Sequence, residues 1–386
     1  MEKILNYSFA ECSELVSVDF GTKLQKMCQH AFENCVSLTT VALPDSLQIF
    51  GGNVGASNPT PNLNGYIFAG CTSLTKVTLP SSLTAIGSYN FLGCTKLETV
   101  YLGGVTSIGT SCFEGCTALK TIGVDSNTAT ANIAALDTVI HLGKECFKDC
   151  TALEVVKLPL FLGKNGKDTP TGITYSYDKT QIGQFTGCTA LKEVHMPLAE
   201  NIAGSMFKDC EVLTTVNVTA DTVKIIYADA FMGTKLQAFD FSAVTTVNDN
   251  AFLGTALAGE LDLPLATKIG ANAFKGCKSL TSIDLPKVTT NLYAYAFADC
   301  TGLITVTLNA FTGSASFITS ETYMGQFSGC TKLDTVRLPK AKYIASYMFE
   351  NCAALTDFDI TNNSVLLGIG DHAFDGCAAL VELDFS

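Results

Sequence analysis

The chain has 386 residues, of which 47% are hydrophobic and only 16% are charged, and its formal net charge is -12 at pH 7. This acidic balance, 24 Lys and Arg against 36 Asp and Glu, argues against nucleic acid and against an anionic membrane surface as partners, because both attract basic patches. No run of about 18 apolar residues occurs, so we expect no direct membrane insertion of this segment.

Phenylalanine recurs at a regular spacing along the whole chain. The basic step is 21 to 25 residues, and four longer steps measure 36, 34, 38 and 30 residues. Such a short, repeated step predicts a repeat solenoid and not a series of globular domains. We therefore expect one solenoid domain over residues 1–386 with about 15 coils, anchored at Phe9, Phe32, Phe68, Phe91, Phe113, Phe147, Phe185, Phe207, Phe231, Phe252, Phe274, Phe297, Phe327, Phe349 and Phe374.

Each coil combines a strand pattern with a turn pattern. A leucine stands six residues after the anchor in thirteen of fifteen coils, and it begins an L-x-x-V-x-L strand such as residues 74–79. Buried and outward positions alternate along such a strand, and Pro80 ends it. Gly-x-x-Ala-Phe stretches, such as 270–274, predict a short helical turn on the opposite side. Stacked at about 4.8 Å, the coils would form a mostly β rod roughly 70 Å long.

The segment 74–94 reads LTKVTLPSSLTAIGSYNFLGC. This pattern, which recurs over essentially the whole chain, resembles the BspA-like, or Treponema pallidum-type, leucine-rich repeat family. The resemblance implies a curved, right-handed leucine-rich-repeat coil on the surface of bacteria or of some protozoan parasites. It also implies adhesion to host or microbial macromolecules, but it does not name a ligand.

Thirteen of the sixteen cysteines stand three residues after an anchor and should form a ladder of buried, free thiols that fill a turn. The coils of Phe231 and Phe252 look like the same repeat with the cysteine deleted. Two further cysteines, Cys112 and Cys146, occupy a slot that holds alanine in other coils. Because no C-x-x-C pair occurs, we expect small-residue packing there, and neither a metal nor a cofactor.

Catalytic motifs are not found in the sequence. The four histidines, His30, His141, His195 and His372, belong to no H-E-x-x-H motif, and no G-x-S-x-G is present. The stretch 163–168 resembles a phosphate-binding loop only superficially, since its glycine spacing and its Ser/Thr position are wrong. The sequence therefore predicts a protein that is not an enzyme.

The outward positions of the expected strands are the first candidates for binding. Three aspartates, Asp240, Asp262 and Asp284, are expected in one column on successive coils, which suggests an acidic strip for a basic partner or a cation. The alternative is a solvated face kept charged for solubility. The candidate binding residues are Tyr101, Glu193, His195, Asp240, Glu260, Asp262, Asp284, Asp357 and Asp359.

Four insertions are the second candidate surface. They span 44–67, 124–141, 158–184 and 308–326, between a strand and the next anchor, so we expect loops that emerge from one side of the solenoid. One-sided insertions can mark a binding face of a repeat protein, and they can equally be tolerated loop variation.

These patterns favour a non-catalytic cell-surface module that adheres to a protein or glycan of host or neighbouring cells. An intracellular scaffold, suggested by the many thiols, is the alternative, and an enzyme is a remote one. Because the chain starts and stops inside a repeat, we expect a fragment of a longer extracellular protein. It should be a monomer with a weak tendency to associate end to end.

Overall fold

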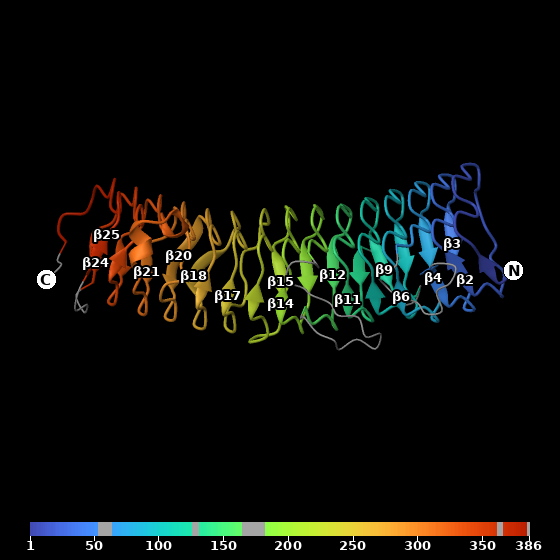
Figure 1. Ribbon diagram of the computed structural model, residues 1–386, viewed down its shortest axis with the longest axis horizontal. Helices are drawn as coiled ribbons and strands as arrows, with labels where there is room; N and C mark the ends of the chain where they lie inside the picture. The colour runs from blue at the N-terminus through green and yellow to red at the C-terminus, as the bar shows by residue number, and fades with distance from the viewer. Residues whose placement is uncertain (53–63, 126–129, 131, 164–181, 361–365, 384–386) are drawn as a thin grey trace. The chain divides into compact units, whose positions relative to one another are not determined.

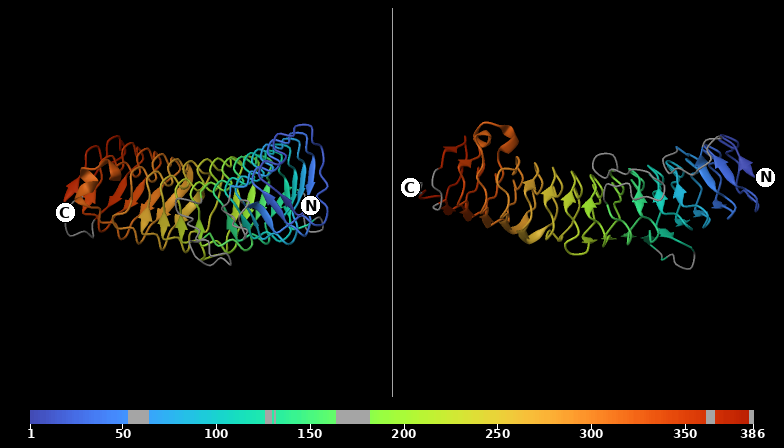
Figure 2. Two further views of the ribbon diagram at one scale, coloured as in Figure 1. Left: turned by 45° about the vertical axis from the view of Figure 1, so that its right-hand side comes forward. Right: turned by 60° about the horizontal axis from the view of Figure 1, so that its bottom comes forward.

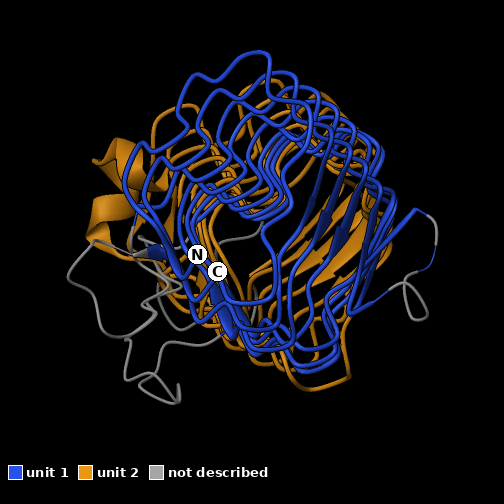
Figure 3. Ribbon diagram, turned by 90° about the vertical axis from the view of Figure 1, so that its right-hand side faces the viewer, with its two compact units in different colours: residues 1–199, 206–217 blue, residues 200–205, 218–386 orange. Residues whose placement is uncertain are grey.

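A computed structural model describes residues 1–52, 64–125, 130, 132–163, 182–360 and 366–383. The chain divides into two compact units (Figure 3). Unit 1 comprises Met1–Ala199 and Met206–Asn217, and unit 2 comprises Glu200–Ser205 and Val218–Ser386. Each unit is a solenoid of short parallel strands, with about 14 turns in the chain as a whole. The predicted fold class is thereby confirmed (Figure 1).

The long strand ladder of each unit is its main sheet, in which every pairing is parallel. In unit 1 it has eight strands: β3 (Thr40–Ala42), β5 (Lys76–Thr78), β7 (Thr99–Tyr101), β9 (Thr121–Gly123), β10 (Ile133–Ala135), β12 (Val155–Lys157), β13 (Glu193–His195) and β15 (Thr215–Asn217). In unit 2 it has five: β18 (Ala258–Asp262), β20 (Ser279–Asp284), β21 (Thr305–Thr307), β22 (Thr335–Arg337) and β24 (Asp357–Asp359).

A second set of short parallel strands, which the sequence analysis did not foresee, follows most main-sheet strands and precedes the next anchor (Figure 2). In unit 1 these strands are β1 (Lys3–Ile4), β2 (Lys26–Cys28), β4 (Ile49–Gly52), β6 (Ala85–Ile86), β8 (Ser107–Ile108) and β11 (His141–Leu142). In unit 2 they are β14 (Asn201–Ile202), β16 (Ile225–Ile226), β17 (Thr246–Val247), β19 (Lys268–Ile269), β23 (Tyr343–Ile344) and β25 (Gly368–Ile369).

The anchors form the core of each unit, as the repeat predicts. The rings of Phe91 and Phe113 stack with centroids 5.3 Å apart, and those of Phe274 and Phe297 stack at 5.1 Å. All four side chains are fully buried. Offset stacking at these separations adds an aromatic contribution to ordinary apolar burial, so each coil stabilises the next one through its anchor.

The predicted helical turns before the anchors are wrong. Residues 270–274 form a hydrogen-bonded turn in which Asn272 has a φ of 52°, and the equivalent Tyr89 has a φ of 64°. A residue in this left-handed region cannot continue a right-handed helix. In the described part of the chain, helix is confined to two 3₁₀ turns, η1 (Ala315–Ile318) and η2 (Glu321–Tyr323). No helix among these residues is long and apolar enough to span a bilayer.

The insertions are not all one-sided loops, which corrects the sequence prediction. The second insertion, 124–141, contributes β10 to the main sheet of unit 1, between β9 and β12. The fourth insertion folds into η1 and η2, and η1 packs against β23, a strand of the second set. Most of insertion 158–184, including residues 164–168 of the glycine-containing stretch, lies outside the described residues, as do 53–63 of the first insertion.

The extra strand β10 widens the main sheet without a matching anchor. Phe113 and Phe147 stack at 5.3 Å, as neighbouring anchors do elsewhere. Two strand spacings, roughly 9.6 Å, nevertheless separate β9 from β12 in the sheet. At this point the main sheet of unit 1 therefore has one strand more than the stack of anchors behind it.

The cysteine ladder packs as predicted, one thiol per coil. Each ladder thiol from Cys35 to Cys377 donates a weak hydrogen bond to the carbonyl oxygen of the anchor in the preceding coil. For example, Cys94 Sγ lies 3.1 Å from Phe68 O, and Cys300 Sγ lies 3.2 Å from Phe274 O. No disulfide links the sixteen cysteines, and fourteen of them are buried, leaving Cys12 exposed and Cys377 partly exposed.

Candidate binding surfaces

Most three-residue strands of the main sheets expose their two outer residues, at least in part, and bury the one between them. In β7, Val100 is fully buried while Thr99 and Tyr101 reach the surface. Parallel register aligns these outward residues in two columns across the sheet. In unit 1 the second column reads Ala42, Thr78, Tyr101, Gly123, Ala135, Lys157, His195 and Asn217. Two of the predicted binding residues, Tyr101 and His195, thus share one column, with the three strands β9, β10 and β12 between them.

Tyr101 borders a hollow of about 740 Å³ at the ends of β5, β7 and β9. The ammonium of Lys76 lies 5.0 Å from the Tyr101 ring centroid, in cation–π contact. The carboxylates of Asp45 and Asp125 also line this hollow. Gly103 is required at its edge, because a Cβ there would lie 2.5 Å from the Pro80 carbonyl oxygen. The hollow therefore offers an aromatic ring together with charges of both signs.

A second, smaller hollow in unit 1 surrounds His195. It measures about 320 Å³ and is lined by Asp137 and Lys157 among others. His195 Nε2 lies 2.9 Å from a Glu193 carboxylate oxygen, and His195 Nδ1 lies 3.3 Å from the Asn217 amide nitrogen. This pattern fits a neutral imidazole that donates through Nε2 and accepts through Nδ1. Glu193 and His195, both predicted from the sequence, are thus brought together into one polar cluster.

The acidic residues of unit 2 are only partly arranged as expected. Asp262 and Asp284 are direct partners in the β18–β20 pairing, and Glu260 lies on the same strand as Asp262. Burial raises the pKa of Asp284, and the neighbouring carboxylates of Asp262 and Glu260 raise it further. Asp284 Oδ1 is buried without a hydrogen-bond partner among the described residues. These three carboxylates are the acidic patch of unit 2.

Asp240, the third aspartate of the predicted column, is not part of the β18–β20 pairing that joins Asp262 and Asp284. The segment around it forms no strand. Its carboxylate accepts hydrogen bonds from the backbone N–H and the hydroxyl of Ser242, at 2.9 and 2.6 Å. This local bonding of an aspartate to a residue two positions later is an Asx-type turn, and it competes with the extended conformation.

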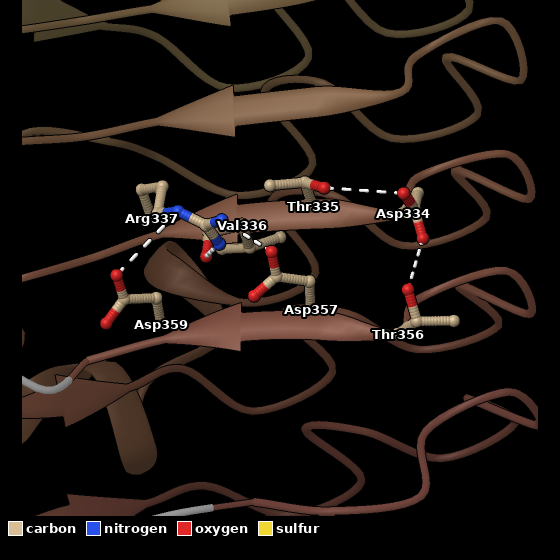
Figure 4. A network of polar contacts seen from close by, with 7 residues as sticks. All are labelled: Asp334, Thr335, Val336, Arg337, Thr356, Asp357 and Asp359. Atoms are coloured by element: carbon tan, nitrogen blue, oxygen red, sulfur yellow. Dashed lines mark hydrogen bonds and ion pairs between the residues drawn. The ribbon is translucent and has the colours of Figure 1, made fainter.

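Asp357 and Asp359, also predicted as acidic binding residues, surround an arginine (Figure 4). Arg337 Nη2 lies 2.5 Å from Asp357 Oδ2, and Arg337 Nε lies 3.7 Å from Asp359 Oδ2. Asp334, the residue before β22, accepts hydrogen bonds from the side chains of Thr335 and Thr356. The arginine is ion-paired with both aspartates and offsets one of their two negative charges.

One row of surface residues was missed by the sequence analysis. Tyr7, His30, Tyr66 and Tyr89 stand two residues before their anchors and stack face to face, with centroids 4.5 to 4.9 Å apart. His30 also lies 2.8 Å from a Glu33 carboxylate oxygen. The recurrence of an aromatic residue at that position was the available signal. The helical turn expected there obscured it, because a helix would not have aligned the rings.

The buried thiols do not support nucleophilic catalysis. Burial raises the pKa of Cys35 and Cys277 to about 11 and that of Cys71 to about 12, so these groups stay protonated near neutral pH. Among the residues that the structure describes, no group of three or more His, Cys, Asp or Glu side chains is arranged to hold a metal ion.

Comparison with solved structures finds leucine-rich repeat proteins. A leucine-rich repeat protein from Bacteroides ovatus is 22% identical with a TM-score of 0.54, covering 89% of this chain and 85% of that one. The T. pallidum leucine-rich repeat protein is 26% identical with a TM-score of 0.36, covering 52% of this chain and 76% of that one. A search of curated proteins finds no match.

The BspA type leucine-rich repeat region matches residues 1–57, 53–135, 126–222, 169–264 and 245–381, which together span almost the whole chain. Repeat proteins of this kind typically mediate protein interactions, and their fold is generally that of a non-enzymatic binding module. The regular anchors, the thiol ladder and this match agree, and the chain belongs to the BspA-type leucine-rich repeat family.

Proposed function

We propose that this chain is a non-catalytic adhesion module of the cell surface, which binds a protein or glycan of host or neighbouring cells through the main sheet of unit 1. The observation that carries the proposal is the pair of hollows around Tyr101 and His195 in one outward column. Each combines charged groups with an apolar or aromatic wall, the mixture that characterises binding sites with defined orientation.

The backbone beneath these hollows supports such a role. The buried valines of β5, β7, β12 and β13 are fully excluded from solvent, and the strands are hydrogen-bonded on both sides. Side chains on a paired strand lose little further conformational freedom when a partner binds, which favours affinity. Family membership supports binding as the function.

The test is binding of the purified chain to immobilised host extracellular-matrix proteins and to a glycan array. Tyr101→Ala and His195→Ala should each weaken the strongest interaction, and Tyr101→Ala by about 2 kcal/mol or more if the ring is a hot spot. Tyr347→Ala is the matched control, since it removes a tyrosine from a turn of unit 2 and should leave binding unchanged. Unaltered binding by both unit 1 variants would reject this surface.

Location is tested separately. Protease treatment of intact source cells should remove the chain, as detected with an antibody against it. Recovery of the intact chain from the cytosol alone would instead favour the intracellular scaffold, for which the free thiols are the argument.

A further inference from the structure

Two successive coils of unit 2 are one residue shorter than their neighbours. From anchor to leucine they run Phe231 to Leu236 and Phe252 to Leu257, five residues instead of six. Thr255 is buried at the position of the ladder thiol, and its Oγ1 lies 3.3 Å from Cys277 Sγ. Threonine therefore fills the cysteine slot, and the residue missing from these coils is the exposed turn residue that follows it. This corrects the view that the cysteine itself is deleted.

The missing turn residues leave a hollow of about 670 Å³ on the surface of unit 2. Gly254, Gly276 and Ala256 line it without long side chains. Gly254 has a φ of +70°, and a Cβ added there would meet nothing within 4 Å, so the space above the backbone is open. The floor of the hollow is consequently made largely of main chain.

Three lysines surround this floor: Lys235, Lys275 and Lys278. Lys275 is held in place, since its ammonium lies 3.8 Å from Asp299 Oδ2 and 5.2 Å from the Tyr295 ring centroid. Asp299 is the one carboxylate among the lining residues. Three positive charges against one are unusual in a chain of net charge -12, and they come from the coils of Phe231 and Phe274, on either side of the coil of Phe252.

We propose that this hollow binds a tetrahedral oxyanion, a sulfate or phosphate ester group. Three ammonium groups around a common space can each donate to a different oxygen of such a group, and the hydroxyls of Ser279 and Thr301 line the same space. An open main-chain floor allows the anion to approach closely. The site is distinct from the proposed adhesion surface, because all its lining residues belong to unit 2, whereas that surface is the main sheet of unit 1.

The experiment is calorimetric titration of the full chain at constant ionic strength with four probes: inorganic sulfate, inorganic phosphate, N-acetylglucosamine 6-sulfate and unsulfated N-acetylglucosamine. Saturable binding of the oxyanion probes, and none of the unsulfated sugar, is expected. Tighter binding of the sulfated sugar than of inorganic sulfate would identify an ester as the source. Lys235→Ala combined with Lys278→Ala should weaken binding at least about tenfold, the effect of losing roughly 1.4 kcal/mol.

The matched control is Lys332→Ala, which removes an exposed lysine from a coil of full length, at the position before its leucine, as Lys235 does in a short coil. It should leave binding unchanged, whereas Asp299→Asn should tighten binding. All substituted side chains are exposed, so thermal melting should confirm that the variants fold. Absence of saturable oxyanion binding, or an equal loss in the Lys332 variant, would overturn the proposal.

Discussion

At the scale of single residues, the ladder cysteines show how position sets chemistry. Cys94 is fully buried and bonded to a backbone carbonyl of the preceding coil. Burial raises its pKa well above the ordinary value, and the same holds for Cys330. Since the thiolate is the reactive form, these thiols are inert packing groups in the folded chain.

Alkylation kinetics test this account. With iodoacetamide at pH 8, the exposed Cys12 should react within minutes in the native protein, while the buried thiols should remain largely unmodified. After denaturation without a reductant, the number of titratable thiols should approach sixteen, which is the cysteine count of the chain. A count near zero, or rapid labelling of the ladder in the native state, would contradict it.

His141 gives a second prediction at this scale. Burial lowers the pKa of His141 to about 4, below its ordinary value of 6.5. The unfolded chain therefore binds a proton more readily between pH 6.5 and 4, so stability falls as the pH drops through this window. His141→Gln should lessen the loss of thermal stability between pH 6.5 and 4 relative to the parent chain. An unchanged slope of Tm against pH would show that His141 does not contribute.

At the scale of elements, the β18–β20 pairing places like charges side by side. Because the pKa of Asp284 is raised by burial and by Asp262 and Glu260, its carboxylate takes up a proton more readily in the folded chain than in the unfolded chain. Its ionisation opposes folding above the unfolded pKa, and stability from this group increases as the pH falls toward 3.8. The arrangement is costly for the isolated unit, as expected where a basic partner would offset the charge.

Asp284→Asn should accordingly raise the Tm of unit 2 unfolding at pH 7, and the gain should vanish below about pH 3.8, the ordinary pKa of the group. Asp357→Asn serves as a contrasting variant, because it removes the partner of Arg337 and should not stabilise the chain. A lower Tm for Asp284→Asn at pH 7 would mean that the ionised carboxylate is well satisfied. The same variant should weaken the binding of any basic partner to the acidic patch.

At the scale of the whole molecule, stability depends on each coil being covered by the next. Phe113 is fully buried between Phe91 and Phe147, whereas Phe9 stacks on Phe32 alone and remains 38% exposed. In unit 2, the large apolar residues Leu367 and Val381 are exposed near the last coils. Coils that contact a neighbour on one side only bury less apolar surface, so they should open more readily.

Hydrogen exchange should show the lowest protection in roughly the first and last coils, and exposed apolar residues there should promote weak association at high concentration. Phe113→Ala should cost about 3–5 kcal/mol, whereas Phe9→Ala should cost distinctly less, because its ring is only partly buried. Uniform protection along the described chain in a strictly monomeric sample would contradict this expectation.

The sequence by itself was sufficient for the repeat, the family resemblance, the anchors and the thiol slot. These features follow from periodicity, because every coil must present the same buried residues to the next. It also placed Tyr101 and His195 on outward strand positions, since alternation along a strand is local.

Only the tertiary structure decided which outward residues meet. Whether Glu193, His195 and Asn217 form one cluster, and whether Arg337 offsets Asp357, depends on register between strands more than twenty residues apart. Neighbouring coils likewise set the position of β10 in the sheet. They also set the stacking of the aromatic rings at turn positions with a positive φ. So is the hollow beside Lys278, which exists because two shortened turns lie next to one of full length. A single coil carries no information about its neighbours, and these contacts arise only when the coils are stacked.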